Sequence, residues 1–217
     1  MYSLRVAERS YGNNGKIVYS ETDTYVDECE SPYTASKIGS EALVRSYGKC
    51  YDIDVSIARF SNVYGKYDVS DRVVPLFVAQ ANNGDDLTVY GDDKMLDFTH
   101  IDDCISGVVS LIEQFTKASG TTFNIASGQG SSLVELGQTI INRLDVEASV
   151  SVKPSRTGEI IRYVADLSKA RTILGYEPEY TLDEGLDSTI EWYLDRPELF
   201  DATLESNGSG NPRVRIV

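Results

Sequence analysis

The chain has 217 residues, with 20 basic and 34 acidic side chains, and therefore a formal net charge of −14. Such an acidic chain is a poor partner for nucleic acid or anionic lipid, because both are bound through basic patches. No apolar run reaches the roughly 20 residues that a membrane helix needs, and the first residues lack the apolar core of a signal peptide. We therefore expect a cytoplasmic, globular protein with no nucleic-acid or membrane partner.

A single histidine, His100, and three cysteines, Cys29, Cys50 and Cys104, limit the possible chemistry. One histidine excludes multi-histidine metal sites and argues against a Ser-His-Asp hydrolase. The cysteines do not have metal-ligand spacing, so we expect reduced thiols. We therefore predict no metal site and interpret His100, which lies in a predicted strand, as a structural residue.

The first strong helix signal is Ser31-Pro32, because serine caps helices and proline fits the first helical turn. Ile38, Ala42 and Tyr47 then predict an apolar face. Further patterns predict strands near 55–61, 87–90, 97–101, 121–126, 150–152 and 162–165, and helices near 74–81, 102–112, 132–141, 166–174 and 181–194. Strands and helices that alternate without an internal repeat indicate an α/β fold.

Helix starts later in the chain carry their own signals. The segments 132–135 and 181–184 both have the Ser/Thr-x-x-Glu spacing of a capping box. Asp102 and Asp103 resemble a carboxylate pair, but they stand at a predicted helix start, where acidic side chains favour capping. We therefore interpret these two aspartates as capping residues.

Tyr33 and Lys37 have a spacing of four, which places both side chains on one face of the predicted helix. An ammonium stabilises a nearby phenolate, so a tyrosine in such a pair can act as general acid or base on a hydroxyl group. Tyr90 and Lys94 have the same spacing, but the intervening 91–93 (GDD) predicts a turn. Taken alone, the first pair is also compatible with an ordinary amphipathic helix.

The sequence around this pair is the first of an ordered series of motifs, beginning with 31–37 (SPYTASK). The others are 59–65 (RFSNVYG), 87–91 (LTVYG), 97–103 (DFTHIDD), 123–128 (FNIASG), 156–159 (RTGE), 165–170 (ADLSKA) and 174–178 (LGYEP). Together they resemble the extended short-chain dehydrogenase/reductase family, the NAD-dependent nucleotide-sugar epimerases and dehydratases, and are most similar to UDP-glucose 4-epimerases. So many motifs in the same order do not arise by chance.

The resemblance implies a role for individual residues. Tyr33 would be the acid/base on the sugar 4-hydroxyl, and Lys37 would hold the nicotinamide ribose of NAD and tune Tyr33. Asn62 would touch the substrate pyrophosphate. The backbones of Thr88 and Tyr90 would pair with the uracil edge.

Two further residues match the family's substrate site. Arg156 would lie near the nucleotide diphosphate, where a guanidinium grips phosphate oxygens, and Glu159 would accept from the ribose hydroxyls. The alternative interpretations are a turn residue for Asn62 and surface charges for Arg156 and Glu159. Leu96 stands where many members have a phosphate-binding arginine, so the phosphate contact would rest more on Arg156 and Arg162.

The resemblance also implies a domain organisation. Residues 1–65 would be a remnant of the NAD-binding Rossmann domain with the catalytic helix. Residues 66–195 would be mainly the smaller α/β nucleotide-sugar-binding domain, with segments that return to the Rossmann sheet, and 196–217 a flexible tail. The implied activity is 4-epimerisation of a UDP-sugar by transient hydride transfer to NAD, in a homodimer.

The chain departs from the family pattern in its first residues. It lacks the glycine-rich turn that meets the NAD pyrophosphate. Aligning Tyr11 with the family places its catalytic Ser/Thr at Ala7, and Glu8 follows where a dehydratase has an Asp-Glu pair. We therefore expect a truncated chain that binds NAD poorly and has little or no turnover alone. The alternatives are a nucleotide-sugar dehydratase or decarboxylase and a non-catalytic nucleotide-sugar-binding fragment.

Overall fold

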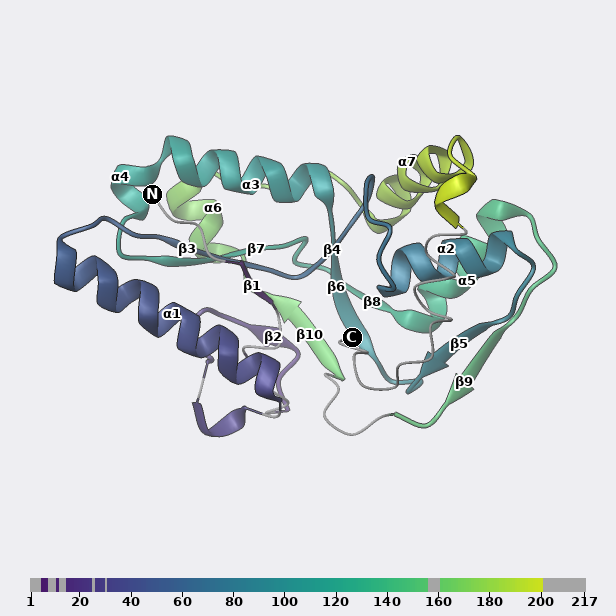
Figure 1. Ribbon diagram of the computed structural model, residues 1–217, viewed down its shortest axis with the longest axis horizontal. Helices are drawn as coiled ribbons and strands as arrows, with labels where there is room; N and C mark the ends of the chain where they lie inside the picture. The colour runs from purple at the N-terminus through teal and green to yellow at the C-terminus, as the bar shows by residue number, and fades with distance from the viewer. Residues whose placement is uncertain are drawn as a thin grey trace. The chain divides into compact units, whose positions relative to one another are not determined.

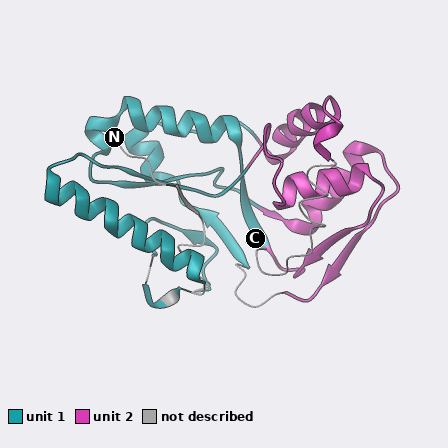
Figure 2. Ribbon diagram, in the orientation of Figure 1, with its two compact units in different colours: residues 1–63, 95–130, 160–180 teal, residues 64–94, 131–159, 181–217 magenta. Residues whose placement is uncertain are grey.

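The computed structural model describes residues 5–7, 11, 15–24, 26–29, 31–155 and 161–200, the first three by their backbone alone. The chain divides into two compact units (Figure 2). Unit 1 comprises 1–63, 95–130 and 160–180, and unit 2 comprises 64–94, 131–159 and 181–217. The expected α/β fold is confirmed, because helices alternate with largely parallel strands (Figure 1). The predicted flexible tail lies, beyond Phe200, outside the described residues.

One parallel sheet of unit 1 has the strand order β1 (Arg5–Ala7), β3 (Ile57–Phe60), β7 (Thr122–Ile125). The backbone of Arg59 in β3 is aligned with Val6 on one side and Asn124 on the other. The structure confirms the strand that the sequence predicts near 55–61. All four residues of β3 are buried, because an interior strand of a parallel sheet is covered on both faces.

A second sheet has the order β2 (Val18–Tyr19), β10 (Arg162–Ala165), β6 (Met95–His100), β4 (Asn62–Tyr64), and β8 (Gly130–Ser132) pairs with β6. Both β2 and β6 run parallel to β10. Strands far apart in the sequence thereby become neighbours. Two of these strands, β4 and β6, carry Asn62 and Asp97, which are described below.

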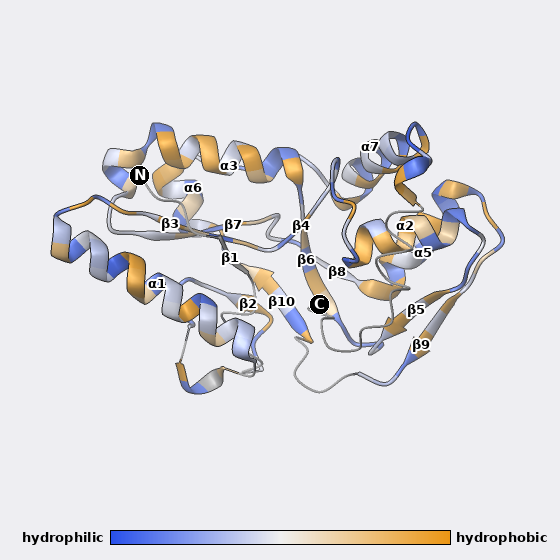
Figure 3. Ribbon diagram, viewed as in Figure 1, coloured by the Kyte–Doolittle hydropathy of each residue, from blue (hydrophilic) through white to orange (hydrophobic). Residues whose placement is uncertain are grey.

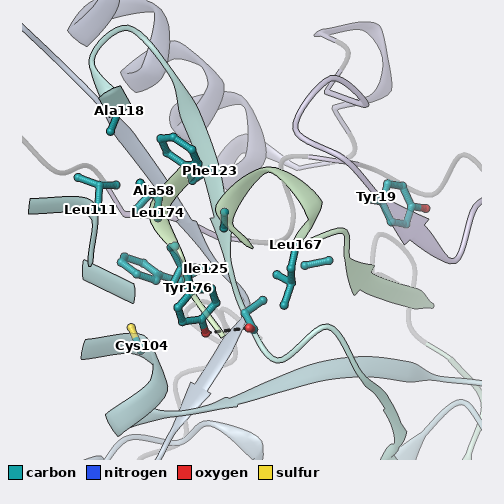
Figure 4. Close-up of a cluster of buried hydrophobic side chains, with 14 of the residues drawn as sticks. Tyr19, Ala58, Cys104, Leu111, Ala118, Phe123, Ile125, Leu167, Leu174 and Tyr176 are labelled. Carbon is teal, nitrogen blue, oxygen red and sulfur yellow. Dashed lines mark hydrogen bonds between the residues drawn. The ribbon is translucent and has the colours of Figure 1, made fainter. Parts of the chain in front are cut away.

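The helices α3 (Ile101–Glu113), α4 (Phe115–Ala118) and α6 (Ser168–Leu174) belong to unit 1 and pack around its apolar core (Figure 4). The core includes Ala58, Cys104, Leu111, Ala118, Phe123, Ile125, Leu167, Leu174 and Tyr176. The Tyr176 hydroxyl donates to the carbonyl of Ala126 at 2.8 Å, the dashed line in Figure 4. At Gly107, α3 approaches β7 so closely that an added Cβ would lie 2.4 Å from Cγ2 of Ile125.

The long helix α1 (Pro32–Tyr51) does not pack through the apolar face that the sequence predicts. Among its 20 residues only Thr34 and Glu41 are buried. Tyr47 is 54% exposed, and Ala42 is exposed as well. Apolar spacing therefore did not reveal the packed side of this helix, because the buried contacts are polar.

Unit 2 contains α2 (Val73–Asn82), β5 (Leu87–Tyr90), α5 (Leu133–Leu144), β9 (Val150–Lys153) and α7 (Leu182–Leu194). The strands β5 and β9 form a parallel pair. Helix α5 buries one apolar face, made by Leu133, Leu136, Gly137, Ile140 and Ile141. These residues recur at helical spacing within the segment near 132–141 that the sequence predicts as a helix, and α5 packs against α2 and the two strands.

Two helix starts show the predicted caps. At α7 the capping box is complete: the Thr181 hydroxyl accepts from the backbone N–H of Glu184, whose carboxylate accepts from the backbone N–H of Thr181. At α5 the Ser132 hydroxyl accepts from the backbone of Val134 and Glu135. Both contacts satisfy N–H groups that a helix start leaves without a partner in the helix.

The start of α3 differs from the prediction, because the capping residue is His100. Its Nδ1 accepts from the backbone N–H of Asp102 at 3.4 Å, and its buried ring lies 4.2 Å from that of Tyr180. Asp103 instead accepts from the backbone N–H groups of Glu179 and Tyr180, at 2.8 and 3.2 Å. A carboxylate can satisfy a distant loop as readily as its own helix, and spacing along the chain does not distinguish the two.

Candidate functional site

The first turn of α1 presents Tyr33 and Lys37 together. The Ser31 hydroxyl accepts from the backbone N–H of Thr34 at 3.2 Å and Pro32 occupies the first turn, which fixes where the helix begins. Lys37 Nζ lies 5.1 Å from the centroid of the Tyr33 ring, and both side chains are half-buried. This distance is within cation–π range, so the ammonium and the aromatic ring interact directly.

Asn62 follows β3 in the chain and also belongs to unit 1. Its Nδ2 donates to the backbone carbonyl of Asp97 at 3.2 Å. The preceding Ser61 donates from its hydroxyl to the Asp97 carboxylate at 3.1 Å. The side chain of Asn62 and the hydroxyl of the preceding Ser61 are therefore both tied to one residue of β6.

Asp97 is a fully buried carboxylate that gathers hydrogen bonds from distant segments. It accepts from the backbone N–H groups of Ser127, Gly128 and Ala165 at 3.0, 2.9 and 3.2 Å, and from the hydroxyl of Ser127 at 2.7 Å. Burial raises the pKa of the Asp97 carboxyl, although the hydrogen bonds from Ser127, Ala165 and Ser61 oppose that shift. Asp97 opens the motif 97–103, but the sequence pattern indicates no role for this residue.

A second buried polar group surrounds Arg59. Its Nε and Nη2 donate to the two carboxylate oxygens of Glu41 in α1, at 2.7 and 2.9 Å. Its Nη1 donates to the Tyr11 hydroxyl and to the carbonyl of Glu21, both at 3.0 Å, and the Tyr11 hydroxyl donates to Oδ1 of Asn124. Burial raises the pKa of Tyr11, and the nearby Arg59 opposes that shift. Sequence reasoning missed this group.

Thr88 and Tyr90 lie on β5 in unit 2. The backbone N–H groups of Leu87 and Gly91 donate to β9 and its preceding residue. Since alternate residues of a parallel strand direct their backbone groups to opposite sides, those of Thr88 and Tyr90 face away from β9. This is the orientation that pairing with a nucleotide base requires.

The remaining predicted site residues lie only partly within the described structure. Arg156 and Glu159 lie outside the described residues. Arg162 begins β10 and is exposed, and Leu96 is half-buried in β6. Within the described ranges no group of three or more His, Cys, Asp or Glu side chains could hold a metal ion, and no helix there is long and apolar enough to span a membrane.

The parallel α/β sheets and the Tyr-x-x-x-Lys helix match the C-terminal portion of Rossmann-type, NAD-binding structures of the short-chain dehydrogenase/reductase family. The family model described as GDP-mannose 4,6 dehydratase matches residues 7–189. The chain therefore belongs to this family of nucleotide-sugar dehydratases and epimerases, as its motifs predicted.

Among curated proteins, the chain is 32% identical over 194 residues to a dTDP-glucose 4,6-dehydratase of Xanthomonas campestris, covering 84% of this chain and 54% of the relative. It is 32% identical over 189 residues to an uncharacterized protein of Methanocaldococcus jannaschii, covering 87% and 57%. The chain thus spans little more than half the length of these curated relatives.

The solved structures that are similar to the chain include a dehydratase and an epimerase. One is a dTDP-glucose 4,6-dehydratase of Streptomyces venezuelae with NAD bound, with a TM-score of 0.84, 28% identity and coverage of 93% of this chain and 62% of that one. The other is a UDP-glucose 4-epimerase of Thermotoga maritima with UDP-glucose, with a TM-score of 0.80, 25% identity and coverage of 89% and 63%. The comparisons favour the dehydratase alternative over the expected UDP-glucose 4-epimerase, since the curated relatives include dTDP-glucose 4,6-dehydratases of several bacteria.

Proposed function

We propose that this chain carries the catalytic helix and the nucleotide-sugar-binding part of an NAD-dependent nucleotide-sugar 4,6-dehydratase. The observation that carries the proposal is the half-buried Tyr33–Lys37 pair at the start of α1. Its single phenol and its ammonium, which has three donors, fit a sugar hydroxyl on one side and a cofactor ribose on the other. Membership of the family supports the same assignment.

In this proposal Tyr33 and Lys37 would hold the nicotinamide end of NAD, which would supply a hydride acceptor for the sugar C4. Tyr33 takes the proton from the 4-hydroxyl, and Lys37 stabilises the phenolate form and donates to the ribose hydroxyls. The α1 start supports this task, because the Ser31 cap and Pro32 fix the first helical turn that holds Tyr33. The tyrosine needs a fixed direction more than a large binding surface, since proton transfer depends on close alignment of donor and acceptor.

The proposed nucleotide contacts lie mainly in unit 2. The backbones of Thr88 and Tyr90 would bind the edge of the base, which is supported by their orientation away from β9. Asn62 would reach the pyrophosphate, with Arg156 on the phosphates and Glu159 on the ribose. These assignments make dTDP-sugars, UDP-sugars and GDP-sugars the substrate classes to compare.

A second candidate is the UDP-glucose 4-epimerase activity that the sequence motifs suggested. The observation in its favour is Ala7-Glu8, which does not reproduce the Asp-Glu pair that a dehydratase uses to remove water. An epimerase needs no such pair, because hydride returns to the sugar without loss of water. A non-catalytic nucleotide-sugar-binding protein is the third candidate.

The test measures binding and chemistry separately. Calorimetry with dTDP-glucose, UDP-glucose and GDP-mannose should detect binding to the 217-residue chain. Mass spectrometry after incubation with NAD tests the chain for loss of water from the bound sugar, and measurable turnover would contradict the expectation that the chain alone has little or none. Tyr33→Phe should lower turnover by about 100- to 10,000-fold while binding persists, because it removes only the acid/base group. Tyr47→Phe, on an exposed position of the same helix, is the matched control.

Each outcome selects one candidate. Loss of water supports the dehydratase, and a change of sugar configuration without loss of water supports the epimerase. Binding without turnover supports the non-catalytic protein. Failure of all three nucleotide sugars to bind would contradict the proposal as a whole.

A further inference from the structure

The helix that carries Tyr33 and Lys37 is held in place by polar contacts. Among the residues of α1 only Thr34 and Glu41 are buried. Figure 3 shows the same helix mostly in hydrophilic and near-neutral colours. The rotation of α1 about its axis is therefore not set by a stripe of apolar side chains, and another contact must set it.

The ion pair between Glu41 and Arg59 has the geometry for that task. Glu41 follows Lys37 by one helical turn and Tyr33 by two, so all three lie toward one side of α1. Its two carboxylate oxygens accept from Nε and Nη2 of Arg59 at 2.7 and 2.9 Å, a bidentate contact. The two side chains are only 9% and 4% exposed, so water hardly screens their interaction.

Arg59 is itself anchored independently of α1. Its backbone lies in β3, between β1 and β7. Its Nη1 donates to the Tyr11 hydroxyl and to the Glu21 carbonyl, each at 3.0 Å. Glu41 therefore meets a guanidinium whose plane is already fixed by the sheet and by two other segments.

We propose that Arg59 and Glu41 are positioning residues, whose ion pair sets the rotation of α1 and thereby the direction in which Tyr33 and Lys37 point. A shift by one residue would turn the helix by about 100°, and only one rotation satisfies a bidentate contact to a fixed guanidinium. The catalytic use of that direction rests on the proposed function. A buried ion pair contributes little net stability, because the desolvation of both charges offsets their attraction, and it can instead specify a single arrangement.

The decisive variant replaces both partners, as Arg59→Met with Glu41→Met in the full 217-residue chain. Methionine keeps much of the volume and leaves no unpaired buried charge, so the double variant should fold with a thermal midpoint close to that of the wild type. The matched control is Arg171→Met with Glu177→Met, which removes a bidentate pair of the same type in which the two side chains are 49% and 64% exposed.

Two readouts then separate positioning from stability. Fluorine NMR of the chain labelled with 3-fluorotyrosine, with Tyr33 assigned by its loss in Tyr33→Phe, should show a displaced or broadened Tyr33 signal in the double variant and an unchanged one in the control. Nucleotide-sugar turnover should fall by about 10- to 100-fold in kcat with little change in KM, because the misdirected group acts on the reaction and not on substrate binding.

Arg59→Lys serves as the second variant, since it keeps the charge but not the bidentate fork. It should displace the Tyr33 signal as well, even where the double variant fails to fold. A folded double variant, or Arg59→Lys, with an unchanged Tyr33 signal would overturn the proposal. A wild-type chain that binds none of the three nucleotide sugars, but whose variants still displace the Tyr33 signal, would refute the proposed function and leave the positioning role supported.

Discussion

Two helices of this chain, α1 and α5, are held against their neighbours in opposite ways. Helix α5 buries an apolar face that includes Leu136 and Ile140, whereas α1 buries only Thr34 and Glu41. Apolar contacts are non-directional and change gradually as a helix shifts or turns. Directional polar contacts allow one rotation or none, and this chain uses them for the helix that carries its candidate catalytic pair.

The largest loss of stability should come from removing one partner of the buried Glu41–Arg59 ion pair that holds α1. Glu41→Leu leaves the Arg59 guanidinium buried without its carboxylate, so we expect the free energy of unfolding to fall by about 3–5 kcal/mol. Urea denaturation followed by circular dichroism measures the loss. Glu177→Leu, which breaks an exposed pair, is the control, and an equal effect of both variants would contradict the importance of burial.

A smaller loss of stability should follow from truncating a buried apolar side chain of α5. Leu136 is fully buried in α5, and Leu136→Ala should cost about 3 kcal/mol through lost burial and a new cavity. The Tyr33 fluorine signal should stay in place, because α5 belongs to unit 2 and the polar contacts of α1 are untouched. A displaced Tyr33 signal in this variant would show that orientation of α1 depends on general stability.

The cap of helix α7 tests how much stability a single polar contact at a helix start contributes. Thr181→Ala removes the hydroxyl that accepts from the backbone N–H of Glu184, and we expect a loss of about 1 kcal/mol. Thr181→Ser keeps the hydroxyl and should recover most of that stability. Thermal unfolding of the two variants, measured side by side, would contradict the capping role if they were equally destabilised.

The smallest expected effect is a change in stability with pH. Hydrogen bonds from the hydroxyl and the backbone N–H of Ser168 hold the pKa of Asp166 below its usual value of 3.8. Since the pKa is lower in the folded than in the unfolded chain, this carboxylate stabilises the fold above about pH 4 and loses that contribution as the pH falls through the lowered value. Asp166→Asn should therefore be less stable than the wild type at neutral pH. Urea midpoints should converge in acid, and a pH-independent difference would contradict the assignment.

The fold could be predicted from the sequence wherever local signals decided it. The capping box of Thr181 and Glu184, the apolar face of α5 and the alternation of strands and helices all depend on residues close in the chain. The apolar face predicted for α1 was wrong, because the contacts that hold this helix involve charged and hydroxyl groups. From sequence alone, a carboxylate such as Glu41 is predicted to be exposed, because its buried partner is not known.

The candidate site was predictable only in part. The spacing of Tyr33 and Lys37 fixed their proximity, because four residues make about one helical turn. The surroundings of Asp97 could not be predicted, since its donors come from three segments about 30 to 70 positions away. His100 as a cap was missed for a simpler reason: an imidazole nitrogen is an uncommon acceptor at a helix start.

The close approach of α3 to β7 restricts which substitutions the protein can accept at Gly107. Alanine at Gly107 would place its methyl group 2.4 Å from Cγ2 of Ile125, a distance that real structures do not contain. Any side chain at position 107 therefore requires Ile125 to shift or to be replaced, and Cε2 of Tyr176, 3.1 Å from the same added Cβ, restricts the space further. A substitution at position 107 therefore depends on which residues occupy positions 125 and 176.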